Sequence, residues 1–216
     1  MKRILVLSLI ILVSACNDDD KDNENVNGIY TSGKVGVLID TTHPEREAFF
    51  IEYNADNQKV DTYQDVSEEI NNIVIAGECN HLSCDLNREL IGNLVSGELL
   101  LTDNSTGLSK SYIKQPSSAD ISSIVGITMS DDFSGTLEVA ADHSFSATTS
   151  FCPSLIGTLQ RYNYYYELEA TASGCTNSNY NGDYSGIGFS AEIENKLTVF
   201  VYMSNEHHSL YGSFHE

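Results

Sequence analysis

Short segments in which apolar and polar residues alternate follow one another along most of the chain. The alternation is clearest over residues 133–139, 144–151, 187–193 and 197–203, where apolar side chains mostly recur at every second position. A period of two is typical of a β-strand with one buried face, and no stretch shows a long apolar stripe of helical period. The sequence therefore predicts an all-β protein built from antiparallel strands.

The first half of the chain predicts a similar series of strands. We expect them over residues 35–39, 48–53, 60–63, 70–76, 97–102 and 108–114. Residues 86–95 fit either one turn of helix or two short strands, and the pattern leaves both open. Polar turns separate these segments, so consecutive strands should pair as antiparallel meanders.

The sequence QPSSA at residues 115–119 is the clearest break in the strand pattern. Pro116 lacks a backbone N–H, and two serines follow it. Ser118 is placed to N-cap a short helix over residues 118–124, with Asp120 in the first turn of that helix. We therefore expect a junction between two subdomains at this point.

The subdomains expected from this junction are an N-terminal β unit over residues 28–115 and a C-terminal β unit over 118–216. The C-terminal unit has about seven consecutive strands with short connections, each apolar on one face. Such a meander curls to bury its inner face. We expect one or two small barrel-like or sandwich subdomains, the C-terminal one barrel-like.

The first sixteen residues form a segment with a different pattern. Two basic residues precede an almost wholly apolar run over residues 4–13, and two small residues then lead to Cys16. The run is too short to span a hydrocarbon core of about 30 Å. Its length and flanks are typical of a signal peptide, which would occupy residues 1–15.

The string Val13-Ser14-Ala15-Cys16 resembles the lipobox of bacterial lipoproteins. This resemblance implies cleavage before Cys16, a thioether-linked diacylglycerol on its sulfur, and usually a further acyl chain such as palmitate on the new amino group. Two or more acyl chains give stable membrane attachment, at ~0.8 kcal/mol per buried CH₂. The alternative is an ordinary secretory signal that happens to end beside a cysteine.

Residues 16–27 would join this lipidated cysteine to the folded part. After Cys16 the segment reads NDDDKDNENVN, which repels itself and should stay disordered as a spacer. An EF-hand calcium loop would need a correctly placed glycine and glutamate, which are missing. The residue after Cys16 is Asn17 and not Asp, which resembles lipoproteins passed to the outer membrane, while the acidic run resembles export signals of some surface-displayed lipoproteins. We expect a lipid-anchored protein of the cell outer membrane, facing either the periplasm or the surroundings.

The charge balance limits the partners of the chain. Asp and Glu number 31 against 11 Lys and Arg, for a formal net charge of −20. So acidic a surface does not attract nucleic acid or anionic lipid head groups. It is compatible with a protein or small-molecule partner that carries positive charge.

Four cysteines remain beyond the one expected to carry lipid. In an oxidising compartment they favour two disulfides, for which three connectivities exist. We expect Cys79–Cys84 and Cys152–Cys175, because each pair is close in sequence and lies within one half of the chain. A zinc site is the alternative, but the spacing of Cys79 and Cys84 around His81 matches zinc motifs poorly.

Catalytic and cofactor motifs are missing from the sequence, so we predict neither enzyme activity nor a cofactor. The nearest match to a nucleophile elbow, at residues 182–186, has Ser185 one place late, and the S-x-x-K string at 111–114 lies in an expected strand. His207 and His208 are weak candidates for metal ligands. Adjacent residues of a strand point to opposite faces, so these two histidines could share one ion only if they lie in a turn, as Ser204-Asn205 suggests. A polar hairpin tip without a metal is the favoured interpretation.

Tyrosines are concentrated at residues 162–166. On a strand, Tyr164 and Tyr166 would face inward with Leu168, and Tyr165 would face outward with the glutamates at alternate positions. Inward tyrosines either line a ligand cavity or fill a core with their hydroxyls at its rim. We take Tyr164 and Tyr166 as candidate ligand-lining residues.

Several features of the second half resemble small periplasmic β domains of Gram-negative bacteria. They are a strand ending near Cys152, the Gly-Thr-Leu string at residues 157–159, the tyrosine-rich strand, Cys175, and the Tyr-Ser-Gly string at 184–186. The resemblance implies no activity.

Three functional hypotheses follow from the sequence. The first is a lipid-anchored, non-catalytic binding or structural module of the cell envelope with an unknown partner. The second is a lipocalin-like carrier of a small apolar ligand, which an enclosed pocket would favour. The third is an enzyme or metal-binding protein with an unfamiliar site, which a cleft joining His43, His207 or His208 to carboxylates would favour.

Overall fold

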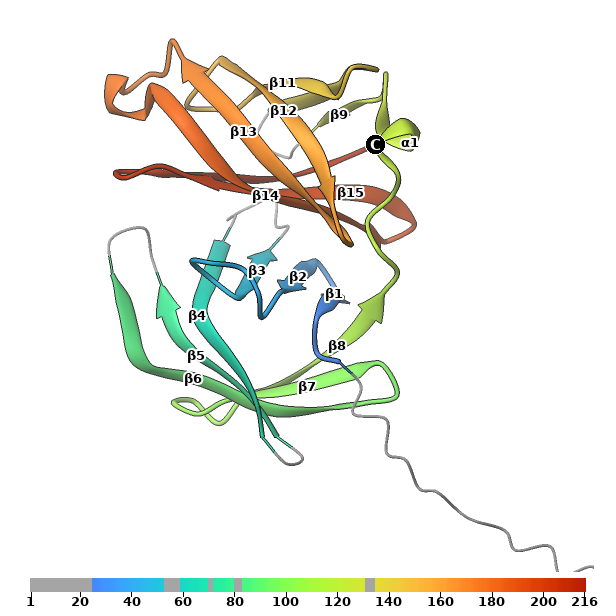
Figure 1. The fold of residues 1–216 in the computed structure, drawn as a ribbon, viewed down its shortest axis with the longest axis vertical. Coiled ribbons are helices and arrows are strands. Elements are labelled where there is room, and N and C mark those ends of the chain that lie inside the picture. Colours follow the sequence, from blue (N-terminus) through green and yellow to red (C-terminus); the bar gives the residue numbers. More distant parts are fainter. Residues whose placement is uncertain (1–24, 53–58, 70–71, 80–82, 131–134) are drawn as a thin grey trace, which may run out of the picture.

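A computed structural model describes residues 25–52, 59–69, 72–79, 83–130 and 135–216. Cys16, the lipobox and the acidic segment up to residue 24 therefore lie outside the described residues. The described part consists of two all-β bodies, one above the other in Figure 1. The prediction of an all-β protein made of antiparallel meanders is confirmed.

The first body is a closed barrel in which each strand pairs with the next along the chain and the last pairs with the first. Its strands are β1 (Gly28–Ser32), β2 (Val35–Ile39), β3 (Ala48–Glu52), β4 (Lys59–Glu69), β5 (Asn72–Cys79), β6 (Cys84–Val95), β7 (Glu98–Asp103) and β8 (Ser109–Gln115). The ambiguous stretch 86–95 belongs to the long strand β6, which pairs with both β5 and β7.

The second body is also a closed barrel, and its closing pairs join β9 to β10 and to β16. Its strands are β9 (Thr128–Ser130), β10 (Thr136–Val139), β11 (Ser144–Thr148), β12 (Ser154–Tyr162), β13 (Tyr165–Ser173), β14 (Gly182–Ile193), β15 (Lys196–Ser204) and β16 (Ser209–His215). The short strand β9 was not expected, because three residues are too few to show an alternation.

The junction between the barrels contains the expected short helix, α1 (Ile121–Ile124). The prediction that Ser118 caps this helix is wrong, because Asp120 occupies the N-cap position and makes no side-chain cap bond. Ser118 is instead buried against the second barrel. Its N–H donates to the Tyr164 carbonyl (2.8 Å), and its hydroxyl accepts from the Ser190 N–H (3.0 Å).

Further hydrogen bonds fix the junction to the second barrel. The Arg161 guanidinium donates to the carbonyls of Ser118 (2.6 Å) and Ala119 (2.9 Å), and the Tyr166 hydroxyl also donates to Ala119. The Ala119 N–H donates to the Ser190 hydroxyl (2.7 Å). These bonds satisfy buried backbone groups that would otherwise cost free energy, so the junction is a docked segment rather than a free linker.

Each barrel has an apolar interior, and a third apolar cluster lies between the barrels. The first barrel contributes outward-facing side chains of β1 to β3, and the second contributes those of β13 to β15. These strands lie next to one another in Figure 1. The main members are Ile29, Leu38, Phe49 and Ile51 on one side, and Tyr165, Ile187, Phe189, Phe200 and Tyr202 on the other.

Strand β14 turns its apolar face toward the first barrel. The sequence assigned Ile187, Phe189 and Ile193 to a face buried inside their own barrel, and this assignment is wrong. The inner face of β14 carries Tyr184, which packs in the interior cluster, and then small residues such as Gly188 and Ser190. Both faces of the strand are therefore buried over residues 187–191, although only one is apolar in sequence.

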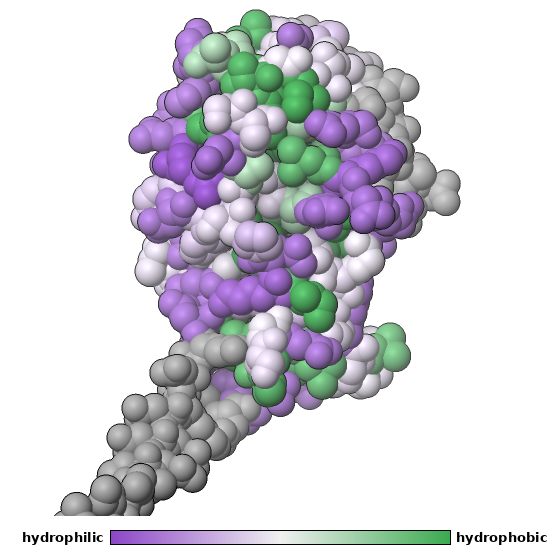
Figure 2. Space-filling model, turned by 90° about the vertical axis from the view of Figure 1, so that its right-hand side faces the viewer, coloured by the Kyte–Doolittle hydropathy of each residue, from purple (hydrophilic) through white to green (hydrophobic). Residues whose placement is uncertain are grey.

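The outer surface away from this contact is mixed. Hydrophilic side chains cover much of the face in Figure 2, with apolar groups between them. Exposed apolar residues elsewhere include Leu86, Leu108 and Phe151. Single exposed apolar residues are normal on a soluble surface and carry no functional meaning.

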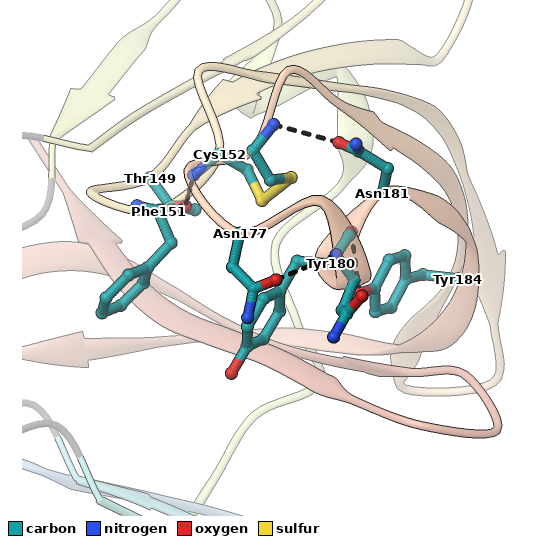
Figure 3. Close-up of a disulfide and its surroundings, with 9 residues drawn as sticks. Thr149, Phe151, Cys152, Asn177, Tyr180, Asn181 and Tyr184 are labelled. Carbon is teal, nitrogen blue, oxygen red and sulfur yellow. Dashed lines mark hydrogen bonds between the residues drawn. A yellow bond between two sulfur atoms is a disulfide. The ribbon is translucent and has the colours of Figure 1, made fainter.

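Both expected disulfides are present. Cys79–Cys84 joins the paired ends of β5 and β6, and Cys152–Cys175 joins the approach to β12 to the segment after β13. Figure 3 shows the second bond beside Asn181, whose side-chain oxygen accepts from the Cys175 N–H at 3.0 Å. Asn177 caps the adjacent short 3-10 helix η1 (Ser178–Tyr180), at whose end Tyr180 lies.

The two disulfides should differ in their contribution to stability. In the chain-entropy model the 23-residue separation of Cys152–Cys175 is worth about 3.5 kcal/mol, and the 5-residue separation of Cys79–Cys84 about 2 kcal/mol. We expect the Cys152→Ser/Cys175→Ser double variant to lose more unfolding free energy than the Cys79→Ser/Cys84→Ser variant. Urea titration under oxidising conditions measures both, and the reverse order would contradict the prediction.

Gly36 should control how closely the barrels approach. A Cβ at this position would lie 2.7 Å from the Phe200 ring and 2.9 Å from the Phe189 ring. We expect Gly36→Val to lower the unfolding free energy by about 1–3 kcal/mol through overpacking. Ser111→Val places the same final side chain on β8, outside the cluster between the barrels, and removes only the exposed hydrogen bond from Ser111 to Glu98. Equal urea midpoints for the two variants would contradict this role of Gly36.

Candidate binding cleft between the barrels

The interior of the second barrel is filled. Apolar side chains leave a cavity of about 30 Å³, whose lining includes Leu168, Phe145, Met203 and Tyr166. This volume suits about one water molecule, whereas small-molecule pockets occupy about 300–1,000 Å³. Tyr166 therefore faces the interior, as expected, but it packs in a core rather than beside a ligand-sized space.

The other tyrosines of this segment point out of the second barrel. Tyr164 lies just before β13, and its hydroxyl donates to the Ile39 carbonyl of the first barrel, so it does not share the inward face of Tyr166. Tyr165 faces outward as expected, yet it is 1% exposed because the first barrel covers it. The expected face for Tyr164 is therefore wrong, and Tyr165 is an interface residue.

A cleft of about 250 Å³ lies where the barrels meet. One wall is the loop between β2 and β3, and the other is the outer face of β13 to β15 with the end of β12. The lining combines apolar, aromatic and charged groups. It comprises Asp40, Thr42, His43, Pro44, Glu45, Arg46, Phe49, Tyr162, Tyr165, Glu167, Leu168, Glu169, Ser185, Gly186, Ile187, Tyr202 and Ser204.

Asp40 is the most buried carboxylate of the cleft, with 3% of its surface exposed. One of its oxygens accepts from the Thr42 N–H (3.0 Å) and hydroxyl (2.6 Å), and the other accepts from the Tyr165 hydroxyl (2.9 Å). Burial, together with this carboxylate, raises the pKa of Tyr165 above its ordinary value. The Asp40–Tyr165 bond joins the two barrels and satisfies a buried charge.

Arg46 makes a second polar link across the cleft. Its guanidinium donates to the Thr62 hydroxyl in the first barrel (2.7 Å) and to the Tyr202 hydroxyl in the second (2.6 Å). The guanidinium carbon also lies 5.7 Å from the centre of the Tyr202 ring, within cation–π range. Arg46 therefore bridges the two barrels through one terminal nitrogen of its guanidinium.

His43 lies half-buried between these two anchors, with its ring edge-on to Phe49 at 5.4 Å. The backbone N–H groups of Glu45 and Arg46 donate to its Nδ1 at 3.4 and 3.3 Å. Burial lowers the pKa of His43, although the carboxylates of Asp40 and Glu45 oppose this effect. The ring is therefore mainly neutral at pH 7.

His43 is the one predicted metal or catalytic candidate that the cleft contains. The cleft places His43 near the carboxylates of Asp40, Glu45 and Glu167, the arrangement that the third hypothesis asked for. Among the described hydrogen bonds, those to the His43 ring come from the backbone N–H groups of Glu45 and Arg46. Among the residues the structure describes, no group of three or more His, Cys, Asp or Glu side chains is arranged to hold a metal ion.

His207 and His208 lie away from the cleft, on the hairpin between β15 and β16. The backbone N–H groups of His207 and His208 both donate to the side-chain oxygen of Asn205, at 2.9 and 2.8 Å, as in a polar turn. The His208 ring stacks on Tyr180 with centroids 4.3 Å apart. This geometry agrees with the polar-hairpin interpretation of the two histidines.

Apart from His43, the residues of the β2–β3 loop were not foreseen as a site. The sequence indicated only a polar turn between the strands expected over residues 35–39 and 48–53. The available signal was the density of charged and titratable side chains from Asp40 to Glu47, between two apolar strands. The partner wall could not be inferred, because it lies more than a hundred residues further along the chain.

Comparison with known proteins gives no assignment. A scan against protein-family models finds no match, and searches of curated proteins and of solved structures find none either. Within the described residues, no helix has the length and apolar character needed to cross a membrane.

The Asp40–Tyr165 bond should couple the two barrels energetically. A double-mutant cycle of Asp40→Asn and Tyr165→Phe should give a coupling of about 1.5–3 kcal/mol in urea unfolding, as expected for a buried hydrogen bond to a charge. The exposed bond between Thr171 and Asp183 (2.7 Å) provides a matched control with Thr171→Val and Asp183→Asn. Its coupling should stay below about 1 kcal/mol.

The same bond predicts an alkaline dependence. The pKa of Tyr165 is raised in the folded state, so its contribution to stability is present below the unfolded pKa, near 10, and is lost at higher pH. Tyr165→Phe should reduce the fall in unfolding free energy above about pH 10. A pH profile that Tyr165→Phe leaves unchanged would contradict the alkaline dependence assigned to this bond. Equal coupling energies in the two double-mutant cycles would contradict the energetic coupling of the barrels through Asp40 and Tyr165.

Proposed function

We propose that this chain is a lipid-anchored protein of the bacterial cell envelope whose folded part is a non-catalytic binding module. The lipobox-like string at residues 13–16 supports the anchor, and the acidic segment after it supports a spacer. Asn17, directly after Cys16, supports sorting to the outer membrane. The partner is a protein or small molecule rather than nucleic acid, given the net charge of −20.

The cleft between the barrels is the observation that carries the binding function. Ligand sites occur preferentially where domains meet, and this cleft presents a few polar groups among apolar walls. The docked junction and the bonds of Asp40 and Arg46 hold both walls in place. A ligand would therefore meet a preorganised site, which lowers the entropic cost of binding.

The fold also limits how binding occurs. Both barrels are closed, so most strand edges of the described sheets are paired; β16 is the exception, because only His215 of this strand pairs with β9. Recognition therefore relies mainly on side chains on the barrel surfaces and in the cleft. The 30 Å³ interior of the second barrel does not favour a carrier of apolar ligands. His43 does share the cleft with carboxylates, so a catalytic or metal-binding role of this histidine is the second candidate function.

Replacement of the expected lipid attachment site tests the anchor. The wild-type protein expressed in its own host should begin at Cys16, carry the mass of acyl chains and sediment with membranes. Cys16→Ser should lose the acyl mass and move to the soluble fraction. Intact-mass spectrometry that finds Met1 retained, or a bare thiol at residue 16, would contradict the anchor. Protease treatment of intact cells then identifies the membrane face.

Hydrogen exchange tests the binding module. Envelope extract from the native host should slow exchange in the loop 40–46 of the delipidated protein. Ser185→Trp fills the cleft from the exposed outer face of β14 and should remove this protection. Glu138→Gln, on β10 of the same barrel, should leave it unchanged. Equal protection in all three proteins would show that the ligand does not occupy the cleft.

A further inference from the structure

The loop between β2 and β3 contains two consecutive turns that are held by side chains. In the first turn, the Asp40 carboxylate accepts from the Thr42 N–H (3.0 Å) and hydroxyl (2.6 Å). In the second turn, Nδ1 of His43 accepts from the backbone N–H groups of Glu45 (3.4 Å) and Arg46 (3.3 Å). The second turn is therefore closed by an acceptor that can take up a proton near neutral pH.

The two bonds to His43 require one protonation state of its ring. An imidazole nitrogen accepts a hydrogen bond only when it carries no proton, so the two donors assign the neutral tautomer with hydrogen on Nε2. When the ring takes up a second proton, both of its nitrogens become donors. Nδ1–H would then face two N–H groups, and both bonds of the turn would be lost.

The packing of the ring stabilises the neutral state. His43 is half-buried, and its ring lies edge-on to the buried Phe49 with ring centroids 5.4 Å apart. A charge in such a place loses part of its hydration, so burial lowers the pKa of His43 from its ordinary value of 6.5. The turn is therefore closed at neutral pH.

Carboxylates around the ring are placed to attract it once it is charged. Asp40 and Glu45 belong to the same loop, and Glu167 acts on the ring from β13 on the opposite wall. The other charged residues in the lining of the cleft are Glu169 and Arg46, and its tyrosines stay neutral in acid. Among the described residues these carboxylates are not grouped as metal ligands. The charged ring thus has an alternative to the turn.

We propose that His43 is a pH-sensitive latch on the cleft: the neutral ring holds the turn over residues 43–46 closed, and protonation opens it. Arg46 ends this turn and bridges the barrels through the hydroxyls of Thr62 and Tyr202. Opening the turn frees the backbone that positions Arg46, which loosens this wall of the cleft. The latch is a property of the loop alone, whereas its effect on ligand binding rests on the proposed function of the cleft.

The direction of the pH dependence follows from the lowered pKa. As the pH falls below about 6.5, the unfolded chain binds a proton at His43 before the folded chain does. The contribution of the neutral ring to stability is therefore complete above this pH and is lost in acid. We expect the latch to open at a pH below 6.5.

Nuclear magnetic resonance of the delipidated protein tests the latch directly. At about pH 7.5 the ring nitrogens of His43 should show the tautomer with hydrogen on Nε2, and at lower pH the imidazolium should replace it. Amide exchange of Glu45 and Arg46, corrected for the direct effect of pH on exchange, should then accelerate about tenfold or more. Its midpoint should coincide with the titration of the ring. Thr42 should not respond, because Asp40 holds its amide.

Matched variants separate the latch from a merely structural role of His43. In His43→Asn the side-chain oxygen can accept from the same amides, as in an Asx turn, and it does not titrate, so exchange should stay slow at both pH values. His43→Phe keeps the aromatic contact with Phe49 but has no acceptor, so exchange should be fast at both. His207→Asn, on the β15–β16 hairpin, should behave like the wild type. Near-UV circular dichroism checks that each variant is folded.

The latch is overturned by any of three results. They are a proton on Nδ1 at about pH 7.5, titration of the ring without faster exchange at Glu45 and Arg46, and an unchanged pH dependence in His43→Asn.

The envelope extract, applied at pH values on both sides of the ring titration, then separates the latch from the proposed function. Protection of loop 40–46 that is lost in acid by the wild type but kept by His43→Asn supports control of binding by the latch. Equal protection of the wild type at both pH values overturns that control. If the extract never protects the loop although the ring titration opens it, the proposed function fails and the latch stands.

Discussion

The contact between the outer faces of the two barrels determines the rest of the molecule. An antiparallel barrel normally buries one face of each strand and exposes the other. Here β14 and β15 also bury their outer faces, and Phe189 and Phe200 stack within that contact at 5.0 Å. The absence of a side chain at Gly36 lets these rings approach the first barrel. The apolar contact ends at the β2–β3 loop, whose side chains are mostly polar or charged. The cleft lies at this boundary.

Polar groups at the edge of the contact make the arrangement specific. An apolar surface alone fixes neither rotation nor sliding of one barrel on the other, because it has no direction. The bonds of Asp40 and Arg46 do have direction, and each reaches a tyrosine of the opposite barrel. The junction at residues 118–120 adds a third point of attachment. Three separated points define one relative orientation, and hence one shape for the cleft.

The sequence predicted much of the fold because strand alternation and turn residues act locally. It indicated the all-β class, the meander order, the break near Pro116 and both cysteine pairings. It failed where a distant contact altered the meaning of a local pattern. The alternation in β14 located an apolar face correctly but could not say which body covers it. Tyr165 was placed outward for the same reason, although another barrel shields it from water.

The candidate site was harder to foresee than the fold. Tyr166 was expected to face inward, and it does, but the pattern cannot show how much space the surrounding side chains leave. From local sequence, residues 40–46 indicate only a loop between two strands. They form part of a cleft because the second barrel packs against them. These residues acquire a common role only through partners such as Tyr165 and Tyr202, which local sequence does not link to them.

The positions of the disulfides have a consequence for how the chain matures. Each bond joins cysteines of a single barrel, and neither crosses the junction. Cys79 and Cys84 also precede Cys152 and Cys175 in the chain. Each bond can therefore close within its own barrel, and neither depends on how the two barrels dock. Reduction of one bond would loosen one barrel while leaving the covalent bracing of the other intact.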